Sequence, residues 1–299
     1  MIDVQRSATD WLSWYFKERT VCLGALIQRH RDLILADPGA QIVGLEAPAT
    51  DARIRCVDVS RLAMALGWAS GRIKLPVARK KPFLQWKMEI DDSVILAYLY
   101  RHHQPRRHLE FGTWEGFGTS LCAQSCGAEI WTINLPDGER TADGNLVYHR
   151  PFQPGEHIPP GAVPSEVNGT STFYQTDSGP FVGWRYRMAG VSHRVHQILA
   201  DSRTWDDSDL DDGFFDSILI DGAHRSDIVV SDTEKALRLL RSGGLMIWHD
   251  FCPVDEVMDK SAATRGVVNA ICARWNAWSP SFKSVFWIWP SYILIGIKR

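Results

Sequence analysis

The sequence has no long apolar run and no excess of charge of either sign. Its longest apolar run covers residues 94–100, far short of the about 20 residues that a membrane-spanning helix needs. Lysine and arginine total 33 against 35 aspartate and glutamate residues, a formal net charge of −2. A general nucleic-acid-binding protein would carry a basic excess, and an acidic disordered chain would carry an acidic one. We therefore expect no nucleic-acid partner and no association with a membrane.

Cysteine is also scarce, with six residues in a chain of 299. The sequence has no CxxC pair and no cysteine–histidine set at the spacing of a zinc site. So few cysteines in so long a chain do not form a disulfide framework, and we interpret them as buried, reduced thiols. The first twenty residues mix charges with their apolar residues and lack the apolar core of a signal peptide. Together these absences predict a cytoplasmic protein.

The first 87 residues are predicted to form a helical extension. Apolar side chains recur at roughly helical spacing over residues 1–37, and Pro38-Gly39 ends that run. We expect one long amphipathic helix there. Two interpretations stay open: the helix packs on the main domain, or it serves as a lid or as an oligomerisation helix that joins two copies of the chain.

From about residue 88 the pattern changes to alternating helices and strands. The expected strands cover residues 108–111, 129–135, 195–200, 215–220, 245–248, 283–289 and 292–298, and the expected helices cover 91–102, 118–126, 227–240 and 264–275. This alternation predicts a domain over residues 88–299 with an α/β fold, whose doubly wound, mostly parallel sheet carries helices on both faces. Ligands of such sheets bind at the carboxyl ends of the strands.

A long segment rich in proline and glycine follows the second expected strand. It is too long for an ordinary connection, so we predict an insertion over residues 136–193. The insertion contains aromatic residues, and the chain has 13 tryptophans in all. The insertion is interpreted either as a lid that covers an acceptor with aromatic walls or as a packed decoration of the domain.

The segment HLEFGTWEGFGTS, residues 108–120, joins a strand end to a glycine-rich turn. Its glycines are spaced G-x-x-x-G-x-G, whereas a dinucleotide-binding turn has G-x-G-x-x-G. Glu110 and Glu115 lie in or beside the turn and would repel a pyrophosphate. They would attract an ammonium and a sulfonium group, so the turn suits S-adenosylmethionine better than a nicotinamide dinucleotide.

A second motif, FFDSILIDGAHRSDIVVSDTEKALRLLRSGGLMIWHDF, covers residues 214–251. With the first motif it resembles a class I S-adenosylmethionine-dependent methyltransferase, and most closely the small-molecule O-methyltransferase-like group. The pattern of that group is a strand, IDG-x-H, a helix that ends in LL-x-x-GG, a second strand and HD. The resemblance covers about residues 88–299. It implies a Rossmann-like sheet of seven strands, in which the terminal hairpin supplies the one antiparallel strand.

The resemblance also assigns contacts to the cofactor, S-adenosylmethionine, where residues match. It places the methionine end against the first strand end and its turn, at Glu110, Gly112, Thr113, Trp114, Gly116 and Gly118. The second strand ends in Asn134, where the family has an acid that binds the ribose hydroxyls. An asparagine can still hydrogen-bond a hydroxyl, and Asp137 is an alternative. Asp201 and Ser202 match the position near the adenine, and Asp221 after the fourth strand completes the cofactor set.

Four residues follow strand ends and should meet in one cleft, namely Asp221, His224, His249 and Asp250. Catechol-type O-methyltransferases hold a metal with an aspartate after the fourth strand and an acid–amide pair after the fifth. By that resemblance, Asp221, His249 and Asp250 would hold a divalent metal ion such as Mg²⁺ or Mn²⁺. An imidazole among oxygen ligands shifts the preference from Mg²⁺ toward Mn²⁺, Fe²⁺ or Zn²⁺. The open alternative is that no metal binds.

His224 lies three residues after Asp221, where the catechol-type enzymes have a catalytic lysine. Methyl transfer to a hydroxyl requires removal of the hydroxyl proton, and a base with a pKa near 7 suits that step. Histidine has such a pKa without any perturbation. We therefore predict His224 as the catalytic base, with His249 as the second candidate.

The predicted function is O-methylation of a hydroxyl on a small-molecule acceptor. A sugar, a glycoside or another secondary metabolite is the acceptor class that the resemblance implies. The alternative is a binding or scaffolding module with a methyltransferase fold and no catalysis, which the departure at Asn134 keeps open. A nicotinamide-dependent oxidoreductase is a third candidate, disfavoured by Glu110, Glu115 and the glycine spacing.

Overall fold

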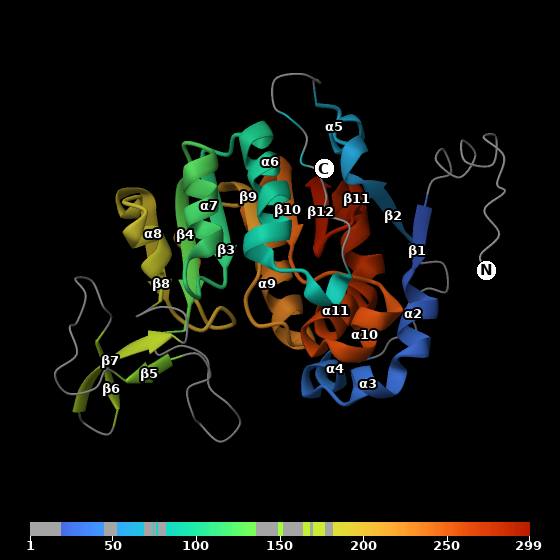
Figure 1. Ribbon diagram of the computed structural model, residues 1–299, viewed down its shortest axis with the longest axis horizontal. Helices are drawn as coiled ribbons and strands as arrows, with labels where there is room; N and C mark the ends of the chain where they lie inside the picture. The colour runs from blue at the N-terminus through green and yellow to red at the C-terminus, as the bar shows by residue number, and fades with distance from the viewer. Residues whose placement is uncertain are drawn as a thin grey trace.

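Figure 1 shows a computed structural model of the chain, in which helices cover both faces of one large sheet. The structure describes residues 19–44, 53–68, 74, 76, 82–135, 149–151, 164–167, 170–176 and 182–299. At residues 19, 88 and 89, and between residues 149 and 176, the structure describes the backbone alone. The arrangement confirms the predicted α/β class with a mostly parallel sheet.

The described strands of the large sheet include all seven that were expected. Their order is β1 (Arg19–Cys22), β2 (Arg53–Asp58), β11 (Phe282–Trp289), β12 (Ile293–Lys298), β10 (Leu240–Trp248), β9 (Phe215–Ile220), β3 (Arg107–Phe111), β4 (Glu129–Asn134) and β8 (Val195–Leu199). The strand β12 is antiparallel to both of its neighbours, so the terminal hairpin supplies a reversed strand as expected. Because β2 pairs with β11 and β1 pairs with β2, the sheet is two strands wider than the predicted seven.

Alternate residues of the central strands face two different helical layers. Ile218 and Ile220 belong to the buried cluster that contains residues of α2 (Leu23–Arg29), α9 (Ser226–Leu239) and α11 (Ala262–Trp278). The residue between them, Leu219, belongs to the cluster that contains residues of α6 (Ser93–His103) and α7 (Phe117–Ser125). All six residues of β9 are buried, as a parallel strand covered on both faces requires. The helical layers therefore leave the strand ends as the place for a ligand.

The N-terminal segment differs from the single helix expected over residues 1–37. Residues 1–18 lie outside the described part, but residue 19 begins β1, and α2, α3 (Arg31–Leu35) and α4 (Pro38–Val43) follow as separate helices. Pro38 begins α4 instead of ending a helix, because proline suits the first turn, where its missing N–H costs nothing. The Asp37 side chain caps α4 by accepting a hydrogen bond from the Gly39 N–H at 3.1 Å. The division of the chain at residue 87 stays a prediction.

The predicted insertion leaves β4 at its carboxyl end. Its described backbone forms a separate antiparallel sheet of β5 (His149–Pro151), β7 (Thr170–Thr176) and β6 (Pro164–Val167), in that order (Figure 1). The chain then forms α8 (Trp184–Met188) before β8. The aromatic side chains of residues 148–174, which the lid interpretation invokes, lie outside the described side chains.

Shorter elements complete the described part of the chain. They are α5 (Leu62–Ala65), α10 (Asp255–Lys260), the 3-10 turns Val59–Arg61, Phe83–Gln85, Ser192–Arg194 and Ser279–Ser281, and the π-helical turn Met88–Asp92. Helix α9 ends at Leu239, and Gly243 and Gly244 of the LL-x-x-GG pattern lie inside β10, near an irregularity in its pairing with β9. Among the described helices, none is both long and apolar enough to cross a membrane.

Candidate active site

A cleft of about 280 Å³ opens where β3, β9 and β10 end. Its charged and polar wall comes from the strand ends, with Glu110, Asp221, His249 and Asp250 among its residues. Its aromatic wall consists of Trp86, Trp114, Phe117 and Tyr292. The predicted convergence of residues from separate strand ends is therefore present in the structure.

The glycine-rich turn after β3 follows the neighbouring chain closely. Gly112 has φ +98°, and a Cβ atom there would overlap the carbonyl oxygen of Asp221. Gly118 opens the first turn of α7, and a Cβ atom there would overlap the Glu110 carboxylate. Gly112 is needed for its positive φ, and at both positions only glycine leaves enough space, because it has no Cβ atom. The turn thus brings bare backbone to the edge of the cleft beside Glu110.

Glu110 is buried at the end of β3 and lines the cleft. Its carboxylate accepts hydrogen bonds from the hydroxyls of Thr119 and Thr132, the latter at 3.0 Å. Burial raises the pKa of Glu110 to about 8, against the lowering effect of these hydrogen bonds. A cationic group placed in the cleft would restore its negative charge.

The sequence analysis expected Glu115 to repel a pyrophosphate and to attract a cationic ligand, but the structure uses this residue differently. It is buried, and its carboxylate is paired with Arg185 of α8 at 2.6 Å. Of the two acids, this pairing leaves Glu110 as the one that a ligand in the cleft would meet. The negative charge of Glu115 instead joins the glycine turn to α8.

Thr113 and Trp114 are held firmly within the turn. The Thr113 hydroxyl is 2.7 Å from that of Thr132 and accepts a hydrogen bond from Gln197 at 2.9 Å. Trp114 has φ +42°, a conformation that is strained for a bulky residue. Its N–H donates to Asn134 Oδ1 at 2.9 Å, and its side chain is 40% exposed at the cleft.

A second, smaller hollow of about 100 Å³ lies where β4 and β8 end, and it contains the predicted ribose and adenine residues. Asn134, Asp201 and Ser202 line it, and Gly112 and Gly222 line both hollows. The amide oxygen of Asn134 is already used by Trp114. Both carboxylate oxygens of Asp201 accept from Arg203, a pairing that lowers the pKa of Asp201.

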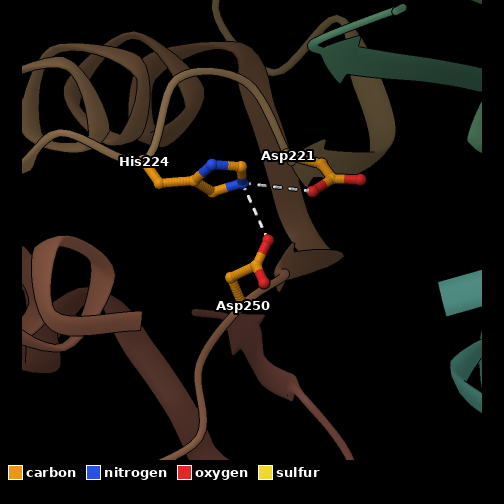
Figure 2. A group of neighbouring side chains, drawn as sticks. All are labelled: Asp221, His224 and Asp250. Carbon is orange, nitrogen blue, oxygen red and sulfur yellow. Dashed lines mark ion pairs between the residues drawn. The ribbon is translucent and has the colours of Figure 1, made fainter. Parts of the chain in front are cut away.

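Asp221, His224 and Asp250 converge on one point in the larger cleft (Figure 2). The Nε2 atom of His224 lies 2.7 Å from Asp250 Oδ2 and 3.7 Å from Asp221 Oδ1. Although it is this close, the buried Nε2 atom has no partner at hydrogen-bond geometry among the described residues. Asp250 holds φ +56°, and such backbone strain persists only where the surroundings impose it.

His249 is buried between three carboxylates. Its Nε2 atom is 3.1 Å from Asp92 Oδ2, and its Nδ1 atom is 3.1 Å from Asp250 Oδ2 and 3.2 Å from Asp221 Oδ1. Both ring nitrogens therefore face acids. The structure brings the three residues of the predicted metal set together, and it also places the Nε2 atom of His224 beside the same two carboxylates.

Neither histidine has the ordinary pKa that the sequence argument assumed. Burial opposes the charge of His224, but the carboxylates of Asp250 and Asp221 outweigh it and raise its pKa to about 10. Burial likewise opposes the charge of His249, and the same two acids raise its pKa well above the usual value. Both rings are protonated at neutral pH, so neither is a ready base while its acids stand beside it.

The donor set of Asp221, His224 and Asp250 fits a divalent metal ion. Each residue offers one ligand atom, and these atoms all lie within 4.8 Å of one another. Two carboxylates and one imidazole suit Mn²⁺, Fe²⁺ or Zn²⁺ better than Mg²⁺. The metal would have to displace the proton of His224, so its binding would release a proton.

The sequence argument missed several residues of the two hollows. Asp92 is fully buried and accepts from the Trp86 indole N–H at 2.8 Å and from the Tyr292 N–H at 3.3 Å. Asp232 lines the smaller hollow from α9, one of its oxygens has no partner among the described residues, and burial raises its pKa to about 7. In the sequence, Asp92 is indicated only by the Asp91-Asp92 pair before an apolar helix. Asp232 is indicated only as an acid on the apolar side of α9.

A family model described as a methyltransferase domain matches residues 109–251. The match runs from the first motif through the second, so over these residues the chain is similar to a methyltransferase domain, in agreement with the predicted class. The comparison with curated proteins found no match.

The comparison with solved structures includes an O-methyltransferase from Bacillus cereus in complex with SAH, at 18% identity and a TM-score of 0.43, covering 80% of this chain and 89% of that one. A second is a putative caffeoyl-CoA O-methyltransferase from Staphylococcus aureus, at 15% identity and a TM-score of 0.44, covering 91% and 100%. A third is the O-methyltransferase TomG from Streptomyces achromogenes, involved in tomaymycin synthesis and solved with SAM, at 16% identity and a TM-score of 0.42, covering 80% and 87%.

Proposed function

We propose that the chain methylates a hydroxyl group of a small molecule, held in the cleft beside Asp221, His224 and Asp250. One observation carries the proposal. A buried carboxylate suited to a cationic cofactor and a cluster of acids and imidazoles suited to a hydroxyl line the same cleft. A sugar, a glycoside or another secondary metabolite is the acceptor class that we propose.

S-adenosylmethionine, when bound, supplies a methyl group on a positively charged sulfur. We assign its ammonium group to Glu110, whose orientation Thr119 and Thr132 fix. We assign its adenosine to the smaller hollow, with Asn134 near the ribose and Asp201, Ser202 and Asp232 near the base. Because Gly112 and Gly222 line both hollows, one ligand can extend across them.

The acceptor hydroxyl is placed beside the acid–imidazole cluster. A divalent ion held by Asp221, His224 and Asp250 would lower the pKa of a hydroxyl bound to it. His249 holds the carboxylates of Asp221 and Asp250 in place and is itself held by Asp92. The aromatic wall would limit the access of water to an acceptor bound in the cleft. In this proposal, His224 acts as a ligand of the metal, and its role as base stays an alternative prediction.

Ligand binding tests the cofactor half of the proposal. We expect S-adenosylhomocysteine in large excess to raise the melting temperature, because any ligand of the native state stabilises it. A parallel titration with NAD should leave the melting temperature unchanged. Stabilisation by NAD and none by S-adenosylhomocysteine would overturn the proposal.

Metal removal tests the acceptor half. We expect EDTA to abolish transfer of a radiolabelled methyl group to a hydroxylated acceptor, and Mn²⁺ to restore it better than Mg²⁺. An unchanged rate in EDTA would refute the metal and return His224 to the role of base. Binding of the cofactor without transfer to any of a panel of hydroxylated acceptors would favour the scaffolding alternative.

A further inference from the structure

Two cysteine thiols face each other at the end of α7, away from the strand ends that form the cleft. The Sγ atoms of Cys122 and Cys126 lie 3.8 Å apart. Four residues of helix separate their Cα atoms by about 6 Å, which falls within the range that disulfides span. The sulfurs need to approach by less than 2 Å to reach a bonded distance of about 2.05 Å.

The two thiols differ in exposure and in acidity. Cys122 is fully buried, and burial raises the pKa of its thiol well above the usual value. Cys126 is partly exposed, and a hydrogen bond from Cys122 lowers the pKa of its thiol to about 7 despite some burial. A partly exposed thiolate beside a second, shielded thiol is the arrangement of an attacking and a resolving cysteine.

Arg194 fixes the backbone around this pair. Its guanidinium donates to the carbonyl of Cys126 at 2.9 Å and to that of Ala123 at 2.6 Å. The positive charge therefore stays close to Cys126 and favours its thiolate. Cys126 is the C-cap of α7 and has extended φ and ψ, and its backbone N–H donates to the Cys122 carbonyl at 3.1 Å.

Two other cysteines differ from this pair in the acidity of their thiols. Cys252 and Cys272 are buried, and burial raises the pKa of both thiols. The sulfurs of Cys122 and Cys126, in contrast, are in contact, and only one of the two is fully buried.

We propose that Cys122 and Cys126 form an oxidation site, at which hydrogen peroxide converts the two facing thiols into a disulfide within one chain. The site is separate from the methyl-transfer proposal and does not depend on it. The sequence analysis interpreted both residues as buried, reduced thiols, and the structure places Cys122 in a buried position but Cys126 in a partly exposed one.

The reaction proceeds in two balanced steps. The Cys126 thiolate sulfur attacks one peroxide oxygen, the O–O bond breaks, and hydroxide leaves, so that Cys126 becomes a sulfenic acid. The Cys122 sulfur then attacks the Cys126 sulfur, the S–S bond forms, and the S–O bond breaks. The leaving hydroxyl takes up the Cys122 thiol proton and departs as water. The cysteine pair loses two electrons, and the peroxide gains them.

Peptide mass spectrometry tests the site on the full chain. Trypsin releases residues 108–140 as one peptide, which contains Cys122 and Cys126 and no other cysteine. After peroxide treatment, denaturation and alkylation, we expect this peptide to lack both alkyl groups and to weigh two hydrogen atoms less than the reduced form. Reduction with dithiothreitol should restore two alkylation sites.

Matched variants separate the two roles. In Cys122→Ser, Cys126 should stop at the sulfenic acid and add dimedone; in Cys126→Ser, Cys122 should remain alkylatable. Cys56→Ser, a change at a partly exposed cysteine elsewhere, should leave disulfide formation as in the wild type. A wild-type peptide that still takes up two alkyl groups after peroxide would overturn the proposal, even if a variant fails to fold. Loss of the Cys122 thiol at the same rate in Cys126→Ser would also overturn it.

Discussion

The two ends of the binding region place carboxylates in opposite electrostatic situations. At the acceptor end, the pKa of Asp250 is well below its usual value, because the charges of His224 and His249 outweigh the effect of burial. At the cofactor end, burial raises the pKa of Glu110 to about 8, and it raises the pKa of Asp232 to about 7 against the opposing charges of Lys235 and Arg203. The carboxylates of the acceptor end are therefore balanced by histidine charges within the protein, whereas Glu110 lacks a positive partner that a cationic ligand would supply.

The largest expected effect comes from removing the negative charge of Asp250 at the acceptor end of the binding region. We expect Asp250→Asn to lower the kcat of methyl transfer by at least about 100-fold, because the change removes a metal ligand and an acid that contacts both histidines. Steady-state kinetics with a responsive acceptor measures the effect. Glu256→Gln, an exposed change on α10, is the matched control. Equal rates for Asp250→Asn and this control would remove Asp250 from the machinery.

A smaller effect should follow from removing the unpaired charge at the other end. We expect Glu110→Gln to weaken S-adenosylhomocysteine binding by about 10- to 100-fold, the usual value of a hydrogen bond to a charged group. Titration calorimetry measures the change. Glu115→Gln is the informative control, because Glu115 is equally buried but already paired with Arg185. We expect Glu115→Gln to lower the stability of the protein but to keep most of its affinity for S-adenosylhomocysteine. A larger loss of affinity in Glu115→Gln than in Glu110→Gln would contradict the assignment of Glu110.

The pH dependence of stability sharpens the same comparison. The pKa of Glu110 in the folded protein, about 8, lies above its ordinary value of 4.5. The folded state therefore holds an extra proton between these values, and its stabilising contribution, complete below pH 4.5, is lost as pH rises toward 8. We expect the free energy of unfolding of Glu110→Gln, relative to that of the wild type, to rise by about 1–4 kcal/mol between pH 5 and pH 8.5. Urea unfolding without ligand measures this difference. A constant difference across that range would show that Glu110 is ionised in the free protein.

The smallest effect is expected at Asn134. We expect Asn134→Asp to change S-adenosylhomocysteine affinity by less than about 10-fold, because aspartate can accept the same hydrogen bond from the Trp114 N–H. Asn134→Ala removes that acceptor and should weaken binding more. Titration of both variants decides the point, and a larger loss in Asn134→Asp than in Asn134→Ala would contradict the turn-holding role.

The strand-end residues could be predicted from sequence, because alternating elements imply a parallel sheet and such a sheet fixes where its strands end. Glu110, Asp221 and Asp250 follow from that rule. Asp92 and Tyr292 reach the cleft through tertiary packing, which no local pattern records. The prediction of an ordinary pKa for His224 and His249 was wrong for the same reason, because both pKa values depend on acids that only the fold brings near. The prediction of one long N-terminal helix was wrong because Arg19–Cys22 pairs with a strand more than thirty residues away in the sequence.

A crystal structure determined with S-adenosylhomocysteine and Mn²⁺ tests the central claim most directly, because it shows both ends at once. We predict the amino group of the ligand at Glu110, its adenine in the hollow lined by Asp201 and Asp232, and the anomalous signal of manganese between Asp221, His224 and Asp250. A ligand bound elsewhere, or an occupied cofactor site with manganese absent from those three residues, would contradict the account.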